Sequence, residues 1–212
     1  MIREAIIISA DKEKISIKRM VINSLLILVL GIILGIISKA LDNTEYNELP
    51  RIMQMLDITI FLGRFAVWIF IAVCISVYSK TNKRAALNVF LFFAGMVTSY
   101  YIYSATVAGF FPRTYAMIWF GITLISPALA FACWYARSEG KVGILISSGI
   151  TGVLLSQAVF LLQGMRITHV LEVVIWLASL CVLRRKPKEF AVMTAISIPV
   201  ALLIQLFVPY WG

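Results

Sequence analysis

The sequence predicts an all-α integral membrane protein with about seven transmembrane helices. Of its 212 residues, 61% are apolar and only 14% are charged, whereas soluble domains are about half apolar and a quarter charged. The mean hydropathy is +0.96. The basic residues gather in short segments between long apolar runs. So little polar surface cannot cover a globule in water, and the excess apolar surface is expected to face lipid.

The apolar runs set the expected helices. A bilayer core of about 30 Å needs about 20 helical residues to cross it. Residues 1–19 form a basic segment, and residues 20–212 form one transmembrane domain, whose first run lacks a signal-peptidase-like site and is expected to stay as an anchor. Pro50 predicts a short interfacial helix over 51–56. The seven expected spans lie at 20–41, 57–79, 86–108, 115–136, 142–163, 167–183 and 190–209.

Loop charge predicts the orientation. If the seven segments all cross, 14 of the 19 basic residues fall on one side. Lys and Arg are enriched in cytoplasmic loops. We therefore expect the N-terminus in the cytoplasm and the C-terminus outside. The 14 basic residues are Arg3, Lys12, Lys14, Lys18, Arg19, Lys80, Lys83, Arg84, Arg137, Lys141, Arg184, Arg185, Lys186 and Lys188.

Small residues recur in the first and fifth segments. Gly31 and Gly35 form a GxxxG pattern, and Gly149 and Gly152 lie in the fifth segment. Such residues mark either a close internal helix contact or a docking face for a partner subunit. The run from Gly35 to Ala40 also resembles the run from Gly152 to Ala158. This similarity suggests a weak parallel repeat of three helices, a linking helix and three helices.

Three charged residues lie inside apolar segments, where each needs a partner or a role. Arg64 lies in the second segment with Asp57 two turns before it, and Glu172 lies at a similar depth in the sixth. We expect Arg64 to pair with Glu172, and Asp57 or Glu172 to orient the guanidinium. A structural ion pair between helices is the alternative.

Further polar and aromatic residues are expected in the outer half of the membrane. Together with the charged residues they predict an outward-facing pocket for a small polar or anionic ligand held by Arg64. Tyrosine and tryptophan also form interfacial belts without binding a ligand. The predicted ligand-binding residues are Arg64, Glu172, His169, Asp57, Tyr100, Tyr101, Tyr103, Trp119, Trp176 and Gln157.

Several classes of function are disfavoured. The net charge of +9 follows membrane topology, so nucleic acid is not an expected partner. Cys74, Cys133 and Cys181 have no CxxC spacing and His169 is the sole histidine, so no metal or other cofactor is expected. No GxSxG, HExxH or P-loop is present, and we expect no enzymatic activity.

Parts of the chain resemble known families. The runs Gly95–Tyr101, Trp134–Arg137 and Gly152–Ala158, with Leu171-Glu172, resemble a family of small bacterial membrane proteins without an assigned function. This resemblance covers about residues 30–183 and implies the cytoplasmic membrane of a bacterium. Gly31 and Gly35 give a looser similarity to the substrate-binding membrane subunits of energy-coupling-factor vitamin transporters, which have six spans.

Three hypotheses remain open from the sequence. The first is a small-molecule binding or transport protein with an outward-facing pocket. The second is a non-catalytic accessory or scaffold subunit, a homo-oligomer or part of a complex, that docks through small-residue helix faces. The third and weakest is an intramembrane enzyme acting on lipid through His169 and Glu172.

Overall fold

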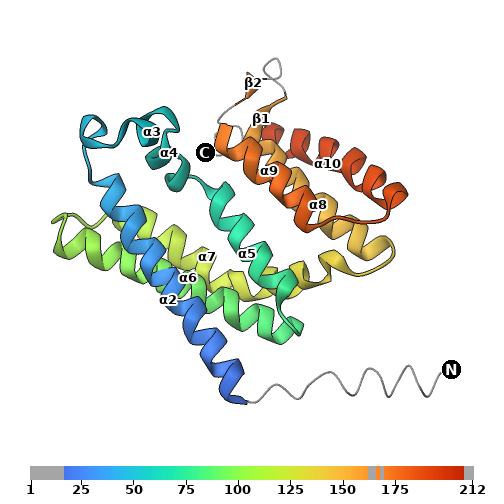
Figure 1. Ribbon diagram of the computed structural model, residues 1–212, viewed down its shortest axis with the longest axis horizontal. Coiled ribbons are helices and arrows are strands. Elements are labelled where there is room, and N and C mark those ends of the chain that lie inside the picture. The colour runs from blue at the N-terminus through green and yellow to red at the C-terminus, as the bar shows by residue number, and fades with distance from the viewer. Residues whose placement is uncertain (1–16, 162–165, 168–169, 208–212) are drawn as a thin grey trace.

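The computed structural model describes residues 17–161, 166–167 and 170–207, and this part of the chain is almost entirely helical (Figure 1). The exception within the described residues is a small antiparallel hairpin, whose strands β1 and β2 have two residues each and pair Phe160 with Arg166. The elements are α2 (Ile17–Asp42), η1 (Tyr46–Glu48), α3 (Arg51–Met55), α4 (Ile58–Gly63), α5 (Phe65–Tyr78), α6 (Asn82–Thr106), α7 (Arg113–Cys133), η2 (Trp134–Arg137), α8 (Lys141–Ala158), β1 (Val159–Phe160), β2 (Arg166–Ile167), α9 (Val170–Val182) and α10 (Pro187–Phe207).

Five helices among the described residues are long and apolar enough to cross a bilayer, which confirms the membrane class of the fold. They are Arg19–Asp42, Asn82–Thr106, Arg113–Arg137, Lys141–Ala158 and Pro187–Phe207. The outer face of α2 is apolar: Leu25, Leu26 and Val29 are each about half exposed or more, and their exposure to water would be unfavourable. A row of exposed aliphatic side chains along one helix belongs in lipid.

The second and sixth expected spans are shorter than predicted. At 1.5 Å per residue, α5 is about 21 Å long and α9 about 20 Å, and neither alone matches a bilayer core of about 30 Å. The expected helix over 142–163 ends at Ala158, because the hairpin β1–β2 begins at the next residue. The expected interfacial helix after Pro50 is present as α3.

The prediction of one continuous helix over 57–79 is wrong. Asp57 has φ 46°, in the left-handed region, and Arg64 is extended between α4 and α5. Gly63 precedes the break and is a poor helix former. Because the helix is interrupted, Asp57 does not lie two turns above Arg64 on a common face, and among the described residues Asp57 has no ion pair.

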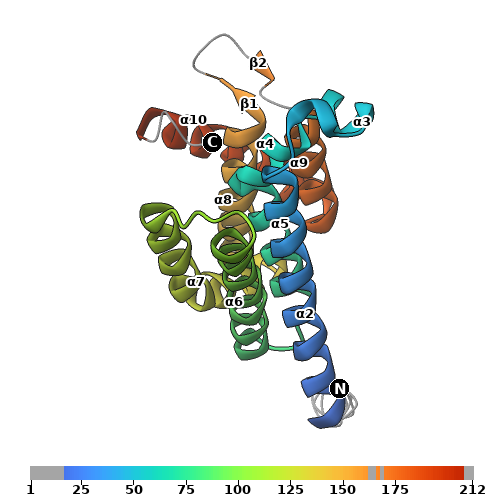
Figure 2. The ribbon, with the colours of Figure 1, turned by 90° about the vertical axis from the view of Figure 1, so that its left-hand side faces the viewer.

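Two groups of helices pack around α5. In the first group α2 lies along α6 and α6 packs on α7, and in the second group α8 lies against α10 and α9 (Figures 1 and 2). Helix α5 contacts α6, α7 and α9 and so joins the groups. The hairpin, α3 and α4 lie at one end of the molecule, and the first residues of α2 lie at the other (Figure 2).

Three glycines lie where two helices of the same chain approach each other closely. A Cβ atom added at Gly31 would meet the backbone of Phe92, and one at Gly35 would meet the backbone of Met96. A Cβ at Gly152 would meet Val200 on α10, whereas one at Gly149 would meet nothing within 4 Å. The packing interpretation of Gly31, Gly35 and Gly152 is therefore confirmed, because these faces are already occupied by helices of the same chain.

Candidate functional site

Arg64 and Glu172 form a buried ion pair, which confirms the pairing expected from the sequence. The guanidinium Nη1 lies 3.2 Å from the carboxylate Oε2. The Arg64 side chain is 10% exposed and the Glu172 side chain 0%. The break between α4 and α5 places Arg64 where α5 begins, and Glu172 lies in the first turn of α9, which packs on α5.

Several buried polar atoms of the described residues, two of them in this pair, are not hydrogen-bonded. Among the described residues, five buried side-chain atoms lack a hydrogen-bond partner: Arg64 Nε, Glu172 Oε1, Trp176 Nε1 and both amide atoms of Gln157. Trp176 lies one turn after Glu172 on α9, and Gln157 lies in the last turn of α8. An unbonded buried polar group costs about 1–3 kcal/mol, so each of these atoms is a candidate for a further polar contact.

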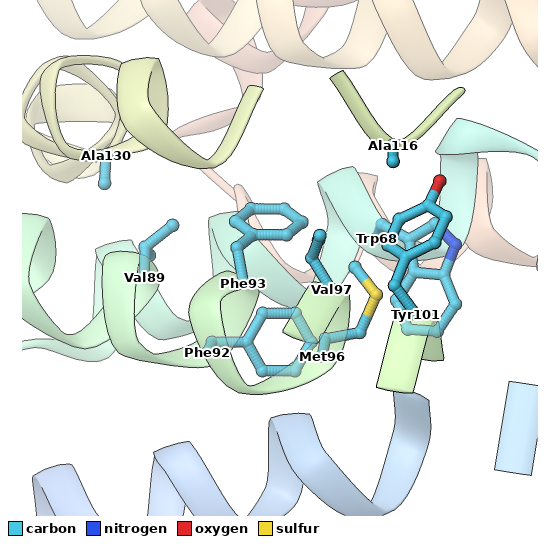
Figure 3. Packing of buried hydrophobic residues seen from close by; sticks show 9 residues of the cluster. All are labelled: Trp68, Val89, Phe92, Phe93, Met96, Val97, Tyr101, Ala116 and Ala130. Atoms are coloured by element: carbon cyan, nitrogen blue, oxygen red, sulfur yellow. The ribbon is translucent and has the colours of Figure 1, made fainter. Parts of the chain in front are cut away.

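A separate cavity lies between α2, α4, α6 and the start of α7. Its volume is about 360 Å³, within the size range of small-molecule pockets. Four of its lining residues, Trp68, Met96, Val97 and Tyr101, also belong to a buried hydrophobic cluster, in which they lie together (Figure 3). The lining residues are Ser38, Lys39, Asp42, Thr59, Leu62, Gly63, Trp68, Met96, Val97, Tyr100, Tyr101, Phe110, Pro112, Tyr115 and Trp119.

One cation and one anion face this cavity. Lys39 Nζ donates to Asp42 Oδ2 at 2.6 Å, and the Tyr100 hydroxyl donates to the same oxygen at 3.1 Å. The ammonium also lies 5.4 Å from the centre of the Tyr100 ring, a cation–π distance. The Lys39 side chain is 10% exposed and that of Asp42 51%, so the cation is nearly buried and the carboxylate that pairs with it is half exposed.

The structure divides the residues that were expected to share one pocket. Tyr100, Tyr101 and Trp119 line the cavity, whereas Tyr103 does not. Arg64 and Glu172 also lie outside the lining, so the cation of this cavity is Lys39 and not Arg64. The lining likewise lacks Asp57, Gln157 and Trp176. His169 lies outside the described residues.

The two sites are nonetheless neighbours along the chain. Gly63 lines the cavity and directly precedes Arg64. Phe65 directly follows Arg64 and stacks on Trp119, with ring centroids 5.0 Å apart. Trp68 Nε1 donates to the Leu62 carbonyl at 2.9 Å across the break, and both residues line the cavity. Any movement of α4 against α5 therefore acts on the cavity and on Arg64 together.

The sequence analysis missed Lys39 and Asp42 as site residues. Both lie at the end of α2 with the spacing i, i+3, at which a helix brings opposite charges together. That spacing, next to a long apolar run, was the available signal. Charged residues at the end of an apolar run also suit a membrane boundary. The partner that distinguishes this site, Tyr100, comes from a helix far along the chain, so its contact with Asp42 was not predictable from local sequence.

Comparison of the chain with protein-family models, with curated proteins and with solved structures gave no match. The function is therefore inferred from the geometry of the site.

Proposed function

We propose that this protein binds a small molecule in the cavity beside Lys39 and carries it across the cytoplasmic membrane of a bacterium. The single observation that carries the proposal is an almost buried cation held at an aromatic-lined cavity of about 360 Å³. Ligand sites combine apolar and aromatic walls with a few converging polar groups, and this cavity has that composition.

The proposed topology has seven spans with the N-terminus inside. Helices α4 and α5 together make the second span, with a break at Arg64, and α9 makes the sixth. Broken helices of this kind are found in transporters where they line a substrate path. The bias of 14 of the 19 basic residues to one side supports the orientation, which puts the Lys39 cavity in the outer half.

The expected repeat of three helices, a linking helix and three helices fits the packing. The two groups of this repeat differ from the packing groups above: they are α2, α5 and α6, and α8, α9 and α10, with α7 as the link. The first and third helices of each, α2 with α6 and α8 with α10, lie against one another. In both groups the contact includes a glycine from the similar runs, Gly35 and Gly152. Arg64 and Glu172 then occupy the middle helices of the two groups, and their ion pair joins the halves. Transporters built from repeats move one half against the other.

The chemistry of the cavity defines a ligand class. A ligand acid group would replace the half-exposed Asp42 carboxylate on the Lys39 ammonium, since both are oxygen acceptors for the same donor. The aromatic side chains, among them Trp68, Tyr101 and Trp119, would hold an apolar or planar body. We therefore propose a small amphipathic acid as the ligand.

The test is native mass spectrometry of the protein gently extracted from its own membrane. A bound small molecule is expected in the natural protein and absent from Lys39→Met. The control is Lys186→Met, whose side chain is 77% exposed and lies outside the cavity. Equal ligand retention in both variants, or no bound molecule in any of them, would overturn the proposal.

The accessory-subunit alternative finds less support. It required docking faces at the glycines of the first and fifth spans, and Gly31, Gly35 and Gly152 contact helices of the same chain. Only Gly149 among the four faces open space.

A further inference from the structure

A second cavity lies at the end of the bundle that carries the basic loops. Its volume is about 570 Å³, and α2, α5, the loop after α5 and the start of α6 enclose it. Its lining is polar at the loop, where Lys80, Thr81 and Arg84 lie, and includes the apolar Leu26 and Ile27 further along α2. Leu26 is 61% exposed, as expected for an apolar side chain of a membrane helix that contacts acyl chains.

Hydrogen bonds hold one cationic group of this cavity, the Arg84 guanidinium, in place. Arg84 Nη2 donates to the Met20 carbonyl at 2.6 Å and to Ser24 Oγ at 3.0 Å. Ser24 in turn donates to Asn88 Oδ1 at 2.8 Å. These bonds fix one end of the guanidinium against α2 and use only part of its five N–H donors.

The surrounding charge is positive without a counter-ion in the lining. Lys80 is exposed and has no ion pair among the described residues, and the lining includes no Asp or Glu. Arg137 lies 5.4 Å from the ring centre of Tyr78, which is itself a lining residue. Thr81 caps the first turn of α6, whose positive dipole end points to the loop.

We propose that this cavity binds the headgroup of an anionic phospholipid from the inner leaflet. Lys80 and Arg84 contact the phosphate, and an acyl chain follows Leu26 and Ile27 into the bilayer. Basic pockets between helices on the cytoplasmic side suit such headgroups. A soluble phosphate would use only the polar half of the cavity, whereas a lipid fills both halves. The inference rests on the proposed orientation and is independent of the Lys39 site.

The experiment uses the full chain in detergent, with phosphatidylglycerol and phosphatidylcholine of the same acyl chains added at equal concentration. Native mass spectrometry should show phosphatidylglycerol retained at least about tenfold more than phosphatidylcholine. In Lys80→Gln this retention should fall about fivefold, as expected for one cation at a membrane surface. Because Lys80 is exposed, this variant should fold normally. Lys186→Gln is the matched control and should retain the lipid unchanged.

Three results would overturn the assignment. The first is equal retention of the two lipids, and the second is unchanged phosphatidylglycerol retention in Lys80→Gln. The third is displacement of phosphatidylglycerol by inorganic phosphate at millimolar concentration, which would assign the cavity to a soluble phosphate compound instead. Loss of the natural ligand in Lys39→Met with normal lipid retention, or the reverse, separates this inference from the proposed function.

Discussion

Breaking the Arg64–Glu172 pair should destabilise the protein far more when one partner is removed than when both are. In Arg64→Met the carboxylate of Glu172, whose side chain is 0% exposed, loses the cation 3.2 Å away and stays buried. Removing one member of a buried pair costs about 3–5 kcal/mol, because an uncompensated charge remains. That is a large share of a typical stability of about 5–15 kcal/mol.

The double variant Arg64→Met/Glu172→Leu removes both charges and should recover most of this loss. Replacing a whole buried pair by apolar residues of similar size is often neutral or stabilising. Here the gain is favoured because the pair is incomplete: Arg64 Nε and Glu172 Oε1 have no hydrogen-bond partner among the described residues, and the double variant removes both atoms.

The assay is a double-mutant cycle on the free energy of unfolding in mixed micelles, with transport or ligand retention measured on the same variants. A coupling energy of at least about 2 kcal/mol is expected. Additive losses would refute the pairing argument. If the stable double variant also retains ligand and transport, the pair is structural only, and its proposed part in movement between the halves fails.

Three further predictions concern the packing of Gly35, the membrane topology and the contact of Gln205 with the end of α8. Gly35→Leu should lower the free energy of unfolding by about 1–3 kcal/mol in the same assay, because the new leucine side chain would meet the backbone of Met96. Gly149→Leu should change it little, because position 149 faces open space. Single cysteines introduced into a cysteine-free background at Lys80 and Lys186 should react with an impermeant thiol reagent only from the cytoplasmic side, and one at Glu48 only from outside; labelling of Lys186 and Glu48 positions from the same side would exclude seven spans. Gln205→Leu should lower the melting temperature more than Gln54→Leu, because the Gln205 amide is bonded to Ser156, Val159 and Leu161 where α8 ends, and equal shifts would contradict that bracing role.

The lengths of the apolar runs predicted the long helices well, because a long apolar run can be recognised from local composition alone. The ends of α2, α6 and α10 lie within a few residues of the expected ones. Depth along a helix also predicted the partner of Arg64, since a buried cation needs an anion at the same level. Both inferences use one-dimensional information that the sequence contains.

The shape of the site was not available in the same way. Arg64 at the break contacts Glu172 of α9, and the Lys39 cavity is lined by rings from α6 and α7. These are long-range contacts, and apolar periodicity does not determine which helix faces meet. The prediction therefore named residues of both places, the ion pair and the cavity, but combined them into one site.

The break at Arg64 also gives the two sites a physical connection. Helix α4 forms part of the cavity wall through Thr59, Leu62 and Gly63, and it is only six residues long. A helix that short has little stability of its own and keeps its position through tertiary contacts. If a ligand binds in this cavity as proposed, it contacts α4 directly, and α4 ends at Gly63, immediately before Arg64. Among the described residues, the Arg64 guanidinium is hydrogen-bonded to Glu172 alone, so a shift of α4 would break few other bonds. The interruption at Arg64, which the sequence did not reveal, therefore gives the proposed binding at Lys39 a route to the Arg64–Glu172 pair.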